Sequence, residues 1–330
     1  MTQFSPRFPF WIGSLGVGLA IFCSIGWIGS EKFLVPPRRA LEPRHQSVLE
    51  NPAAFGLELG ETFSVTAPDG VELKARLISP AANPGEAVKT RRMRERLNVP
   101  HDVSATVVML HGRGGIKEDA FPVAERFVAA GFACLVFDAR AHGVSGGEFT
   151  TYGAREVEDL RAVINAAEDH YGKETLGSLV GFGISLGAAV LLQALPEESR
   201  LEAAVLVSPF AELETVIHRA VENVVDSRMP ALLPGLVMKF GGLRGGFAPS
   251  KIRPVDQAKT IGVPIMIVHA EDDRVIPPLQ SRRVLDALPA REQAHRWRSV
   301  EDANHGNVLA RGGDDLYQEM IEFWLKSVDT

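Results

Sequence analysis

The sequence has little cysteine and no excess of positive charge. It contains 2 cysteines, and its 35 basic residues are outnumbered by 41 acidic ones. Cys23 and Cys134 are too few for a disulfide framework or a structural zinc site. A net charge of −6 argues against nucleic acid as a partner, because phosphates favour a basic surface. The hydrophobic fraction of 45% is ordinary for a globular protein and excludes a disordered chain or a multi-span membrane protein.

Charged residues are missing from residues 10–30. A run of about 20 apolar residues spans the ~30 Å hydrocarbon core of a bilayer when it is helical. Trp11 and Trp27 lie near its ends, where indole rings favour the lipid–water interface. A cleaved signal peptide is the alternative, but its apolar core is usually shorter and ends at a small-x-small site, which we do not find. We therefore expect residues 1–30 to form a single-pass membrane anchor.

Basic and proline residues follow this run. Positive charge next to a spanning helix favours the cytoplasmic side, although long domains often cross regardless, so the side of the catalytic domain stays open. The prolines of residues 31–60 predict an extended tether. The basic residues are Lys32, Arg38, Arg39 and Arg44, and the prolines are Pro36, Pro37, Pro43 and Pro52.

Strand and helix patterns alternate beyond residue 60. Short, continuous apolar runs are typical of parallel strands buried on both faces, and amphipathic or fully apolar helices separate them. The alternation predicts one α/β domain with a doubly wound, mostly parallel sheet over residues 61–330. The expected strands are 61–67 and 71–79, a hairpin around Pro68-Asp69-Gly70, followed by 105–110, 133–137, 179–182, 203–207 and 264–268; the expected helices are 154–170, 188–195 and 314–327.

Two segments interrupt the alternation. Lys89–Arg96 carries five basic residues and is interpreted as a solvated loop insertion, with a patch facing anionic lipid as the alternative. Residues 211–258 contain several prolines and glycine pairs. They predict a helical insertion over the carboxyl edge of the sheet, either a lid or substrate wall or an irregular excursion.

The pattern G-x-S-x-G occurs twice. It marks a sharp strand-to-helix turn that exposes a nucleophilic serine at a helix start. Gly183–Gly187 follows an apolar run and precedes an apolar helix, whereas Gly143–Gly147 is followed by more loop. We therefore predict Ser185 as the nucleophile and treat Ser145 as a loop serine.

Further segments then match one family in order, and from about residue 61 onward the chain resembles the α/β hydrolases. The segments resemble the family's oxyanion loop, its D-x-R-G-H-G-x-S stretch, its H-G-x-x-D-x-x-V-P segment and its G-x-H loop. Alanine replaces the usual glycine at Ala141 and Ala270. Within the family the chain is most similar to the serine aminopeptidase-type branch of membrane-anchored hydrolases. The segments are His111–Gly115, Phe137–Ser145, His269–Pro277 and Ala303–Gly306.

The resemblance implies a catalytic triad of Ser185, Asp273 and His305, in the chain order of that family. His305 would take the proton of Ser185, and the carboxylate of Asp273 would orient the imidazole. Asp272 lies one residue away from the motif position. Asp302 is interpreted as a loop-capping residue.

The resemblance also implies an oxyanion hole formed by the backbone N–H groups of Leu186 and Arg113. The Arg113 guanidinium is expected to face solvent, with a substrate carboxylate as the alternative partner. His111, His142 and His269 lack metal-site spacing and are expected to orient loops by hydrogen bonds.

These features predict a serine hydrolase that cleaves an ester, thioester or amide of a small-molecule or acyl substrate through an acyl-enzyme, with no metal and no organic cofactor. Two alternatives remain open. An acyltransferase would use the same triad, and a non-catalytic binding module would keep the fold without turnover. The sequence gives no indication of the substrate or of the oligomeric state.

Overall fold

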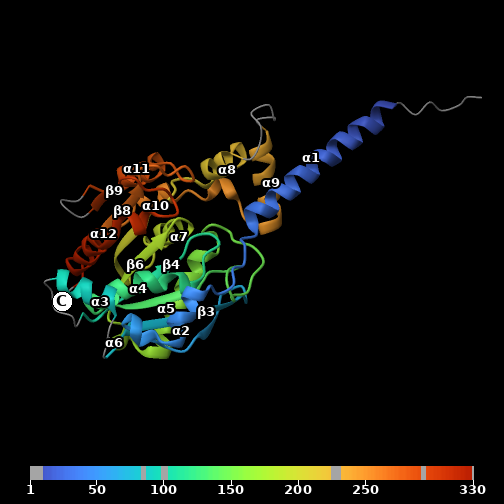
Figure 1. The fold of residues 1–330 in the computed structure, drawn as a ribbon. Coiled ribbons are helices and arrows are strands. Elements are labelled where there is room, and N and C mark those ends of the chain that lie inside the picture. Colours follow the sequence, from blue (N-terminus) through green and yellow to red (C-terminus); the bar gives the residue numbers. More distant parts are fainter. Residues whose placement is uncertain (1–9, 83–86, 98–102, 224–231, 291–294, 329–330) are drawn as a thin grey trace, which may run out of the picture.

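The computed structural model describes residues 10–82, 87–97, 103–223, 232–290 and 295–328. Side chains of residues 10–19, 21 and 22 are outside this description. Nine strands among the described residues form one sheet in the order β1-β3-β5-β4-β6-β7-β8-β9, with β2 paired to β3 (Figure 1). The strands are β1 (Leu57–Leu59), β2 (Phe63–Thr66), β3 (Glu72–Pro80), β4 (Ala105–Leu110), β5 (Ala133–Asp138), β6 (Ser178–Ile184), β7 (Leu201–Val207), β8 (Ile265–Ala270) and β9 (His295–Val300).

The sheet is antiparallel at one edge and parallel elsewhere. Strands β1 and β2 pair antiparallel with β3, and β3 pairs antiparallel with β5. From β5 onward every pairing is parallel. Central β4 is buried along its whole length, as its unbroken apolar run predicts. The carboxyl ends of β4, β6 and β8 therefore meet at one edge, where loops can bring distant residues together.

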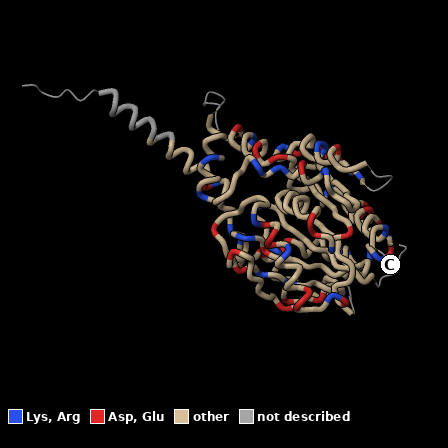
Figure 2. Tube along the Cα trace, turned by 180° about the vertical axis from the view of Figure 1, so that it is seen from behind, with Lys and Arg blue, Asp and Glu red and all other residues tan. Residues whose placement is uncertain are grey.

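Helices cover both faces of the sheet. Alternate residues of β4 enter two cores: Val108 and Leu110 face α5, α7, α10 and α11, whereas Val107 and Met109 face α3, α4 and α12. Acidic and basic residues are interspersed over the domain (Figure 2). The helices are α1 (Phe10–Leu34), α2 (Pro43–Glu50), η1 (Pro52–Phe55), α3 (Val88–Arg96), η2 (Lys117–Ala120), α4 (Phe121–Phe127), η3 (Val128–Ala130), α5 (Glu156–Tyr171), α6 (Lys173–Leu176), α7 (Leu186–Ala194), α8 (Leu213–Glu222), α9 (Leu233–Gly245), η4 (Pro249–Lys251), α10 (Pro254–Ala258), α11 (Pro278–Ala287) and α12 (Val308–Leu325).

The expected membrane anchor over residues 1–30 is wrong. In the part of the chain that the structure describes, none of the helices combines the length and the apolar character needed to cross a bilayer. This finding also overturns the expected single-pass membrane localisation, and it gives no support for membrane association through the helix. Residues 1–9 of the expected anchor lie outside the described residues.

The apolar residues at the carboxyl end of α1 pack within the protein instead. A Cβ on Gly29 would lie 2.5 Å from a methyl carbon of Val237 on α9, so only glycine allows α1 to cross α9 at this separation. Farther along, Phe33 stacks on Tyr152 with ring centroids 4.7 Å apart. Leu34 is fully buried in the core. Part of the apolar run thus serves as an internal packing surface, which a hydropathy pattern alone does not distinguish from a bilayer span.

The carboxyl end of α1 is bonded to the domain through its last carbonyl groups. These groups lack partners within a helix and must be satisfied elsewhere. The backbone N–H of Thr150 donates to Leu34 O at 2.9 Å, and the Tyr152 hydroxyl donates to Phe33 O at 2.8 Å. Arg244 on α9 donates to the backbone carbonyl of Trp27 at 3.2 Å and pairs with Glu31. This end of α1 is therefore part of the folded domain.

Two other segments differ from expectation. Residues 31–60, expected to be an extended tether, contain the end of α1 together with α2, η1 and β1, which joins the sheet. Residues 89–96, expected to be a solvated loop, lie in helix α3. Its buried side chains Thr90 and Met93 lie three positions apart and face the domain. Its Lys89 pairs with Glu125 on α4 at 2.9 Å.

The insertion over residues 211–258 is helical. Helices α8 and α9 lie beyond the carboxyl edge of the sheet, and α9 packs beside α1 (Figure 1). Residues 224–231 of the insertion lie outside the described residues.

Candidate active site

Ser185 lies at the turn between β6 and α7. Its backbone has φ 53° and ψ −111°, a left-handed conformation that non-glycine residues rarely adopt. Its N–H donates to Val207 O on β7 at 2.8 Å, which fixes the turn to the sheet. A Cβ on Gly187 would lie 2.3 Å from Leu110 O, and one on Gly183 would lie 2.7 Å from backbone atoms of Ala188. Both glycines are therefore required by close backbone approach.

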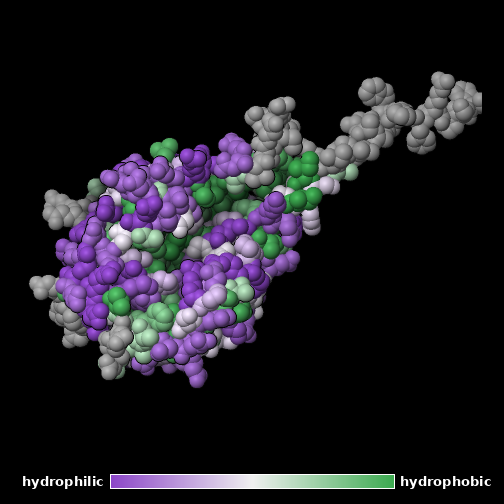
Figure 3. All heavy atoms as spheres, viewed as in Figure 1, coloured by the Kyte–Doolittle hydropathy of each residue, from purple (hydrophilic) through white to green (hydrophobic). Residues whose placement is uncertain are grey.

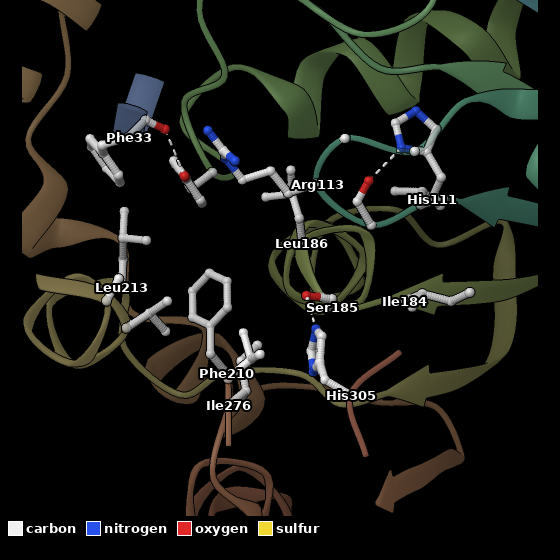
Figure 4. Close-up of a pocket in the computed structure, with 18 of the residues that line it drawn as sticks. Phe33, His111, Arg113, Ile184, Ser185, Leu186, Phe210, Leu213, Ile276 and His305 are labelled. Carbon is white, nitrogen blue, oxygen red and sulfur yellow. Dashed lines mark hydrogen bonds between the residues drawn. The ribbon is translucent and has the colours of Figure 1, made fainter. Parts of the chain in front are cut away.

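The structure brings Ser185, His305 and Asp273 together. Figure 4 shows the first two of these residues, with Ser185 beside the ring of His305. The Ser185 Oγ lies 3.0 Å from His305 Nε2, and His305 Nδ1 lies 2.6 Å from Asp273 Oδ2. A carboxylate only accepts hydrogen bonds, so Nδ1 carries the proton and Nε2 is left to accept from the serine hydroxyl. Asp273 follows β8, His305 precedes α12 and Ser185 follows β6, so three parallel strands and their loops position the group.

Asp273 is held as a carboxylate. Burial by itself raises its pKa, but hydrogen bonds from His269 and His305 hold the pKa well below its ordinary range. The backbone N–H groups of Val275 and Ile276 also donate to its Oδ1, at 2.9 and 2.8 Å. Neighbouring Asp272 is exposed. These contacts give the imidazole of His305 a fixed, charged partner.

Two backbone N–H groups lie on the elements expected to form an oxyanion hole. Leu186 is the first residue of α7, so its N–H is one of the helix-start donors without an intrahelical acceptor. Arg113 lies in the loop after β4, which packs over the nucleophile turn: a Cβ on Gly112 would lie 3.6 Å from the Ser185 Cβ. Both residues line the same cavity as Ser185.

The Arg113 side chain has a partner that neither sequence interpretation gave. Its Nη2 donates to the backbone carbonyls of Lys32 and Val35, at 2.5 and 2.9 Å. These carbonyls lie in the last turn of α1 and one residue beyond it, where a cation is also favoured by the helix dipole. The guanidinium therefore joins the loop after β4 to α1.

Ser145, in the second G-x-S-x-G pattern, has a different environment. Its hydroxyl donates to Asp138 O at 2.6 Å and accepts from the Lys74 N–H at 2.9 Å. The residue is 2% exposed. The hydroxyl thus joins the loop to β3 and β5.

Three further histidines near the site bond to loops. Half-buried His111 accepts from the backbone N–H of Ala139 at 3.0 Å, and its Nδ1 lies 2.8 Å from Gly112 O. His142 Nδ1 lies 2.8 Å from Arg140 O, and burial lowers the pKa of His142 to about 3. His269 contacts the Ser281 hydroxyl and Ile276 O. Each ring thus orients a loop at the edge of the sheet that carries the site.

A cavity of about 930 Å³ opens at Ser185. Figure 3 shows hydrophobic residues around the base of α1 and α9 that continue into a hollow of the surface. The helix α1 was not recognised as part of the site from the sequence. The signal was present, because its cavity-lining residues recur at helical spacing. They are Ile25, Ile28, Gly29, Lys32 and Phe33.

Comparisons with known proteins agree with this architecture. The structure resembles the esterase Pf2001 of Pyrococcus furiosus, with a TM-score of 0.65, 23% identity, and coverage of 90% of this chain and 98% of that one. It also resembles the acylaminoacyl peptidase of Pyrococcus horikoshii, with a TM-score of 0.59, 14% identity, and coverage of 88% and 44%. These likenesses show that the chain has the α/β-hydrolase fold.

Sequence comparisons find matches to parts of the chain. The family model described as serine aminopeptidase, S33, matches residues 101–251. The chain is 26% identical to YqkD of Bacillus subtilis over 189 residues, which cover 57% of this chain and 61% of that protein. It is 28% identical to the monoacylglycerol lipase of Mycolicibacterium smegmatis over 225 residues, 59% of this chain and 79% of the lipase. The chain therefore spans less than two thirds of the length of YqkD.

Proposed function

We propose that the protein is a serine hydrolase that cleaves an ester, thioester or amide through an acyl-enzyme on Ser185. The observation that carries the proposal is the continuous hydrogen-bonded series from Ser185 Oγ through His305 to Asp273, at 3.0 and 2.6 Å. The position of Ser185 at a strained strand-to-helix turn supports a nucleophilic role, because that turn exposes the hydroxyl beside helix-start N–H groups.

In the first half of the reaction, His305 Nε2 takes the proton of the Ser185 hydroxyl as Oγ bonds to the substrate carbonyl carbon. The N–H groups of Leu186 and Arg113 stabilise the negative charge on the carbonyl oxygen. His305 then gives its proton to the leaving group as the carbonyl–leaving-group bond breaks, and the acyl group stays on Ser185.

In the second half, water loses a proton to His305 and attacks the acyl carbon. The bond to Ser185 Oγ breaks, and His305 returns the proton to that oxygen. The Asp273 carboxylate stabilises the imidazolium that forms in each half. The products are a carboxylic acid and the free leaving group.

Labelling with a fluorophosphonate tests this proposal. Such a probe phosphonylates an activated serine, so we expect the wild-type protein to be labelled and the Ser185→Ala variant to remain unlabelled. Ser145→Ala is the matched control, because it removes the serine of the same pattern in a different environment, and it should be labelled. Labelling of Ser185→Ala equal to that of the wild type would contradict the proposal.

A further inference from the structure

Three helices present apolar faces to the cavity beside Ser185. On α8 the lining residues recur at spacings of three and four, so they form one stripe along the helix. The stripe on α1 has the same spacing, and α9 adds residues one turn apart. The lining residues of α8 and α9 are Leu213, Val216, Ile217, Ala220, Val221, Leu233 and Val237.

The void between these stripes is unusual for a protein interior. Side chains in a core are close-packed, and an amphipathic helix normally packs its apolar face against another element. Here the stripes of α1 and α8 line a cavity of about 930 Å³, at the upper end of the ~300–1,000 Å³ of small-molecule sites. Apolar walls of this kind favour an apolar ligand group that displaces water.

Three of the charged side chains at the cavity are already engaged, whereas Lys32 of α1 also lines the cavity and is exposed. Arg113 binds the carbonyls at the end of α1, Lys117 pairs with Asp138 at 3.0 Å, and Arg39 pairs with Asp119 at 2.8 Å. Apolar side chains therefore make up most of the wall that meets a substrate chain.

The direction of the chain follows from the proposed reaction. The leaving group must face His305, which donates its proton. Figure 4 shows Phe33, Leu213 and Phe210 on one side of Ser185, with His111 and Ile184 on the other, and Phe33 lies beyond Phe210 as seen from His305. The acyl group can therefore extend away from His305, between α8 and α1.

We infer that the site takes a long, apolar acyl group and that helix α1 forms one wall of its binding site. This inference rests on the proposed function. Each buried methylene contributes roughly a fourfold gain in binding, and the gain appears in kcat/KM where the chain stays bound in the transition state. Residues of α1 thus determine acyl-chain specificity although none belongs to the proposed triad.

The test compares p-nitrophenyl acetate with p-nitrophenyl octanoate, which share a leaving group and differ in the acyl chain. With the wild-type full chain we expect kcat/KM to be about tenfold or more higher for octanoate. Octyl acetate carries the chain on the alcohol instead. If octyl acetate is favoured and p-nitrophenyl octanoate shows no advantage over p-nitrophenyl acetate, the inference is overturned.

The variant Ile28→Asp places a charge on the α1 wall. We expect kcat/KM for octanoate to fall by about tenfold and that for acetate to change by less than about twofold, because only the longer chain would desolvate the carboxylate. Ser24→Asp is the matched control: it adds the same charge to an exposed position of α1 that does not line the cavity. It should leave both values unchanged.

If Ile28→Asp lowers both activities equally, the same comparison is made with Val221→Asp, which places the charge on the α8 wall. A selective loss on octanoate supports the inference, whereas equal losses in both variants overturn it. If the wild type hydrolyses none of these esters and resists the fluorophosphonate, the proposed function itself fails. Hydrolysis of acetate without a preference for octanoate overturns only the acyl-chain inference.

Discussion

The turns at residues 143–147 and 183–187 have the same G-x-S-x-G pattern, yet the glycines serve different purposes in each. Gly143 and Gly147 have φ of 47° and 86°, so they allow left-handed backbone in a loop. At the other turn the serine itself has positive φ, and its flanking glycines are needed because neighbouring backbone leaves no room for a Cβ. The turn of the proposed nucleophile is therefore distinguished by a positive φ at the serine itself, whereas at the other turn the positive φ values belong to the flanking glycines.

The largest effect is expected from removing what Ser185 has and Ser145 lacks, a histidine partner. In His305→Gln the hydroxyl keeps its place but loses its base, so kcat/KM for acetate should fall by about 10³-fold or more. Steady-state kinetics on a p-nitrophenyl ester measure this. His218→Gln, on the exposed side of α8, is the control, and a similar loss there would contradict the assignment.

A smaller effect is expected at the glycines. In Gly187→Ala the new Cβ would meet Leu110 O, so the oxyanion loop or the turn must shift, and kcat/KM should fall by about 10²-fold. Gly146→Ala is the comparison substitution at the other turn: it lies one residue before the equivalent position, and a Cβ there would lie 3.2 Å from Glu72 O. It should keep nearly full activity, and equal losses in both variants would remove the distinction between the turns.

Ser145→Ala should affect stability instead of catalysis. It leaves the Lys74 N–H and the Asp138 carbonyl without their hydroxyl partner, which costs about 1–3 kcal/mol of the free energy of unfolding. Urea denaturation measures this loss, with esterase activity of the folded protein as the control. An unchanged urea midpoint would show that the hydroxyl does not hold the loop.

The smallest effect concerns buried His142, in the loop before Ser145. Burial lowers its pKa to about 3, below the ~6.5 of an unfolded chain. The unfolded state therefore binds the extra proton, and the stability due to the neutral ring is present above about pH 6.5 and is lost as the pH falls toward 3. Between pH 7 and 5.5 this amounts to about 1 kcal/mol.

The variant His142→Gln removes this titration. Its free energy of unfolding should fall by about 1 kcal/mol less than that of the wild type between pH 7 and pH 5.5, as measured by urea denaturation at both values. An equal pH dependence in the two proteins would place the acid sensitivity elsewhere.

Most of the sheet could be predicted because its strands are buried on both faces. The run 105–110 coincides with β4, and 203–207 lies within β7. Strand β9 was missed, because it is an edge strand whose residues His295–Ser299 are only partly buried and include two arginines. Its sequence therefore lacks the apolar run that marks the central strands.

The residues of the site could be selected from motif spacing, since the ends of parallel strands meet at one edge. Motif spacing does not predict side-chain contacts between segments that are distant in the sequence. The partner of Arg113 lies at residues 32–35, and the partner of Lys89 is Glu125. Nothing in the local pattern of either segment indicates the other. The apolar run of α1 was misassigned for the same reason, because its packing surface is α9.

Arg113 connects helix α1 to the candidate active site. Its side chain donates hydrogen bonds to carbonyls at the end of α1, and its backbone N–H is a proposed donor to the carbonyl oxygen of the substrate. A ligand contact that stabilises the position of α1 should therefore also stabilise the loop after β4. By reciprocity, a contact that orders this loop stabilises the position of α1 by the same coupling free energy. The rate of the proposed reaction would then depend on whether α1 is packed against the domain.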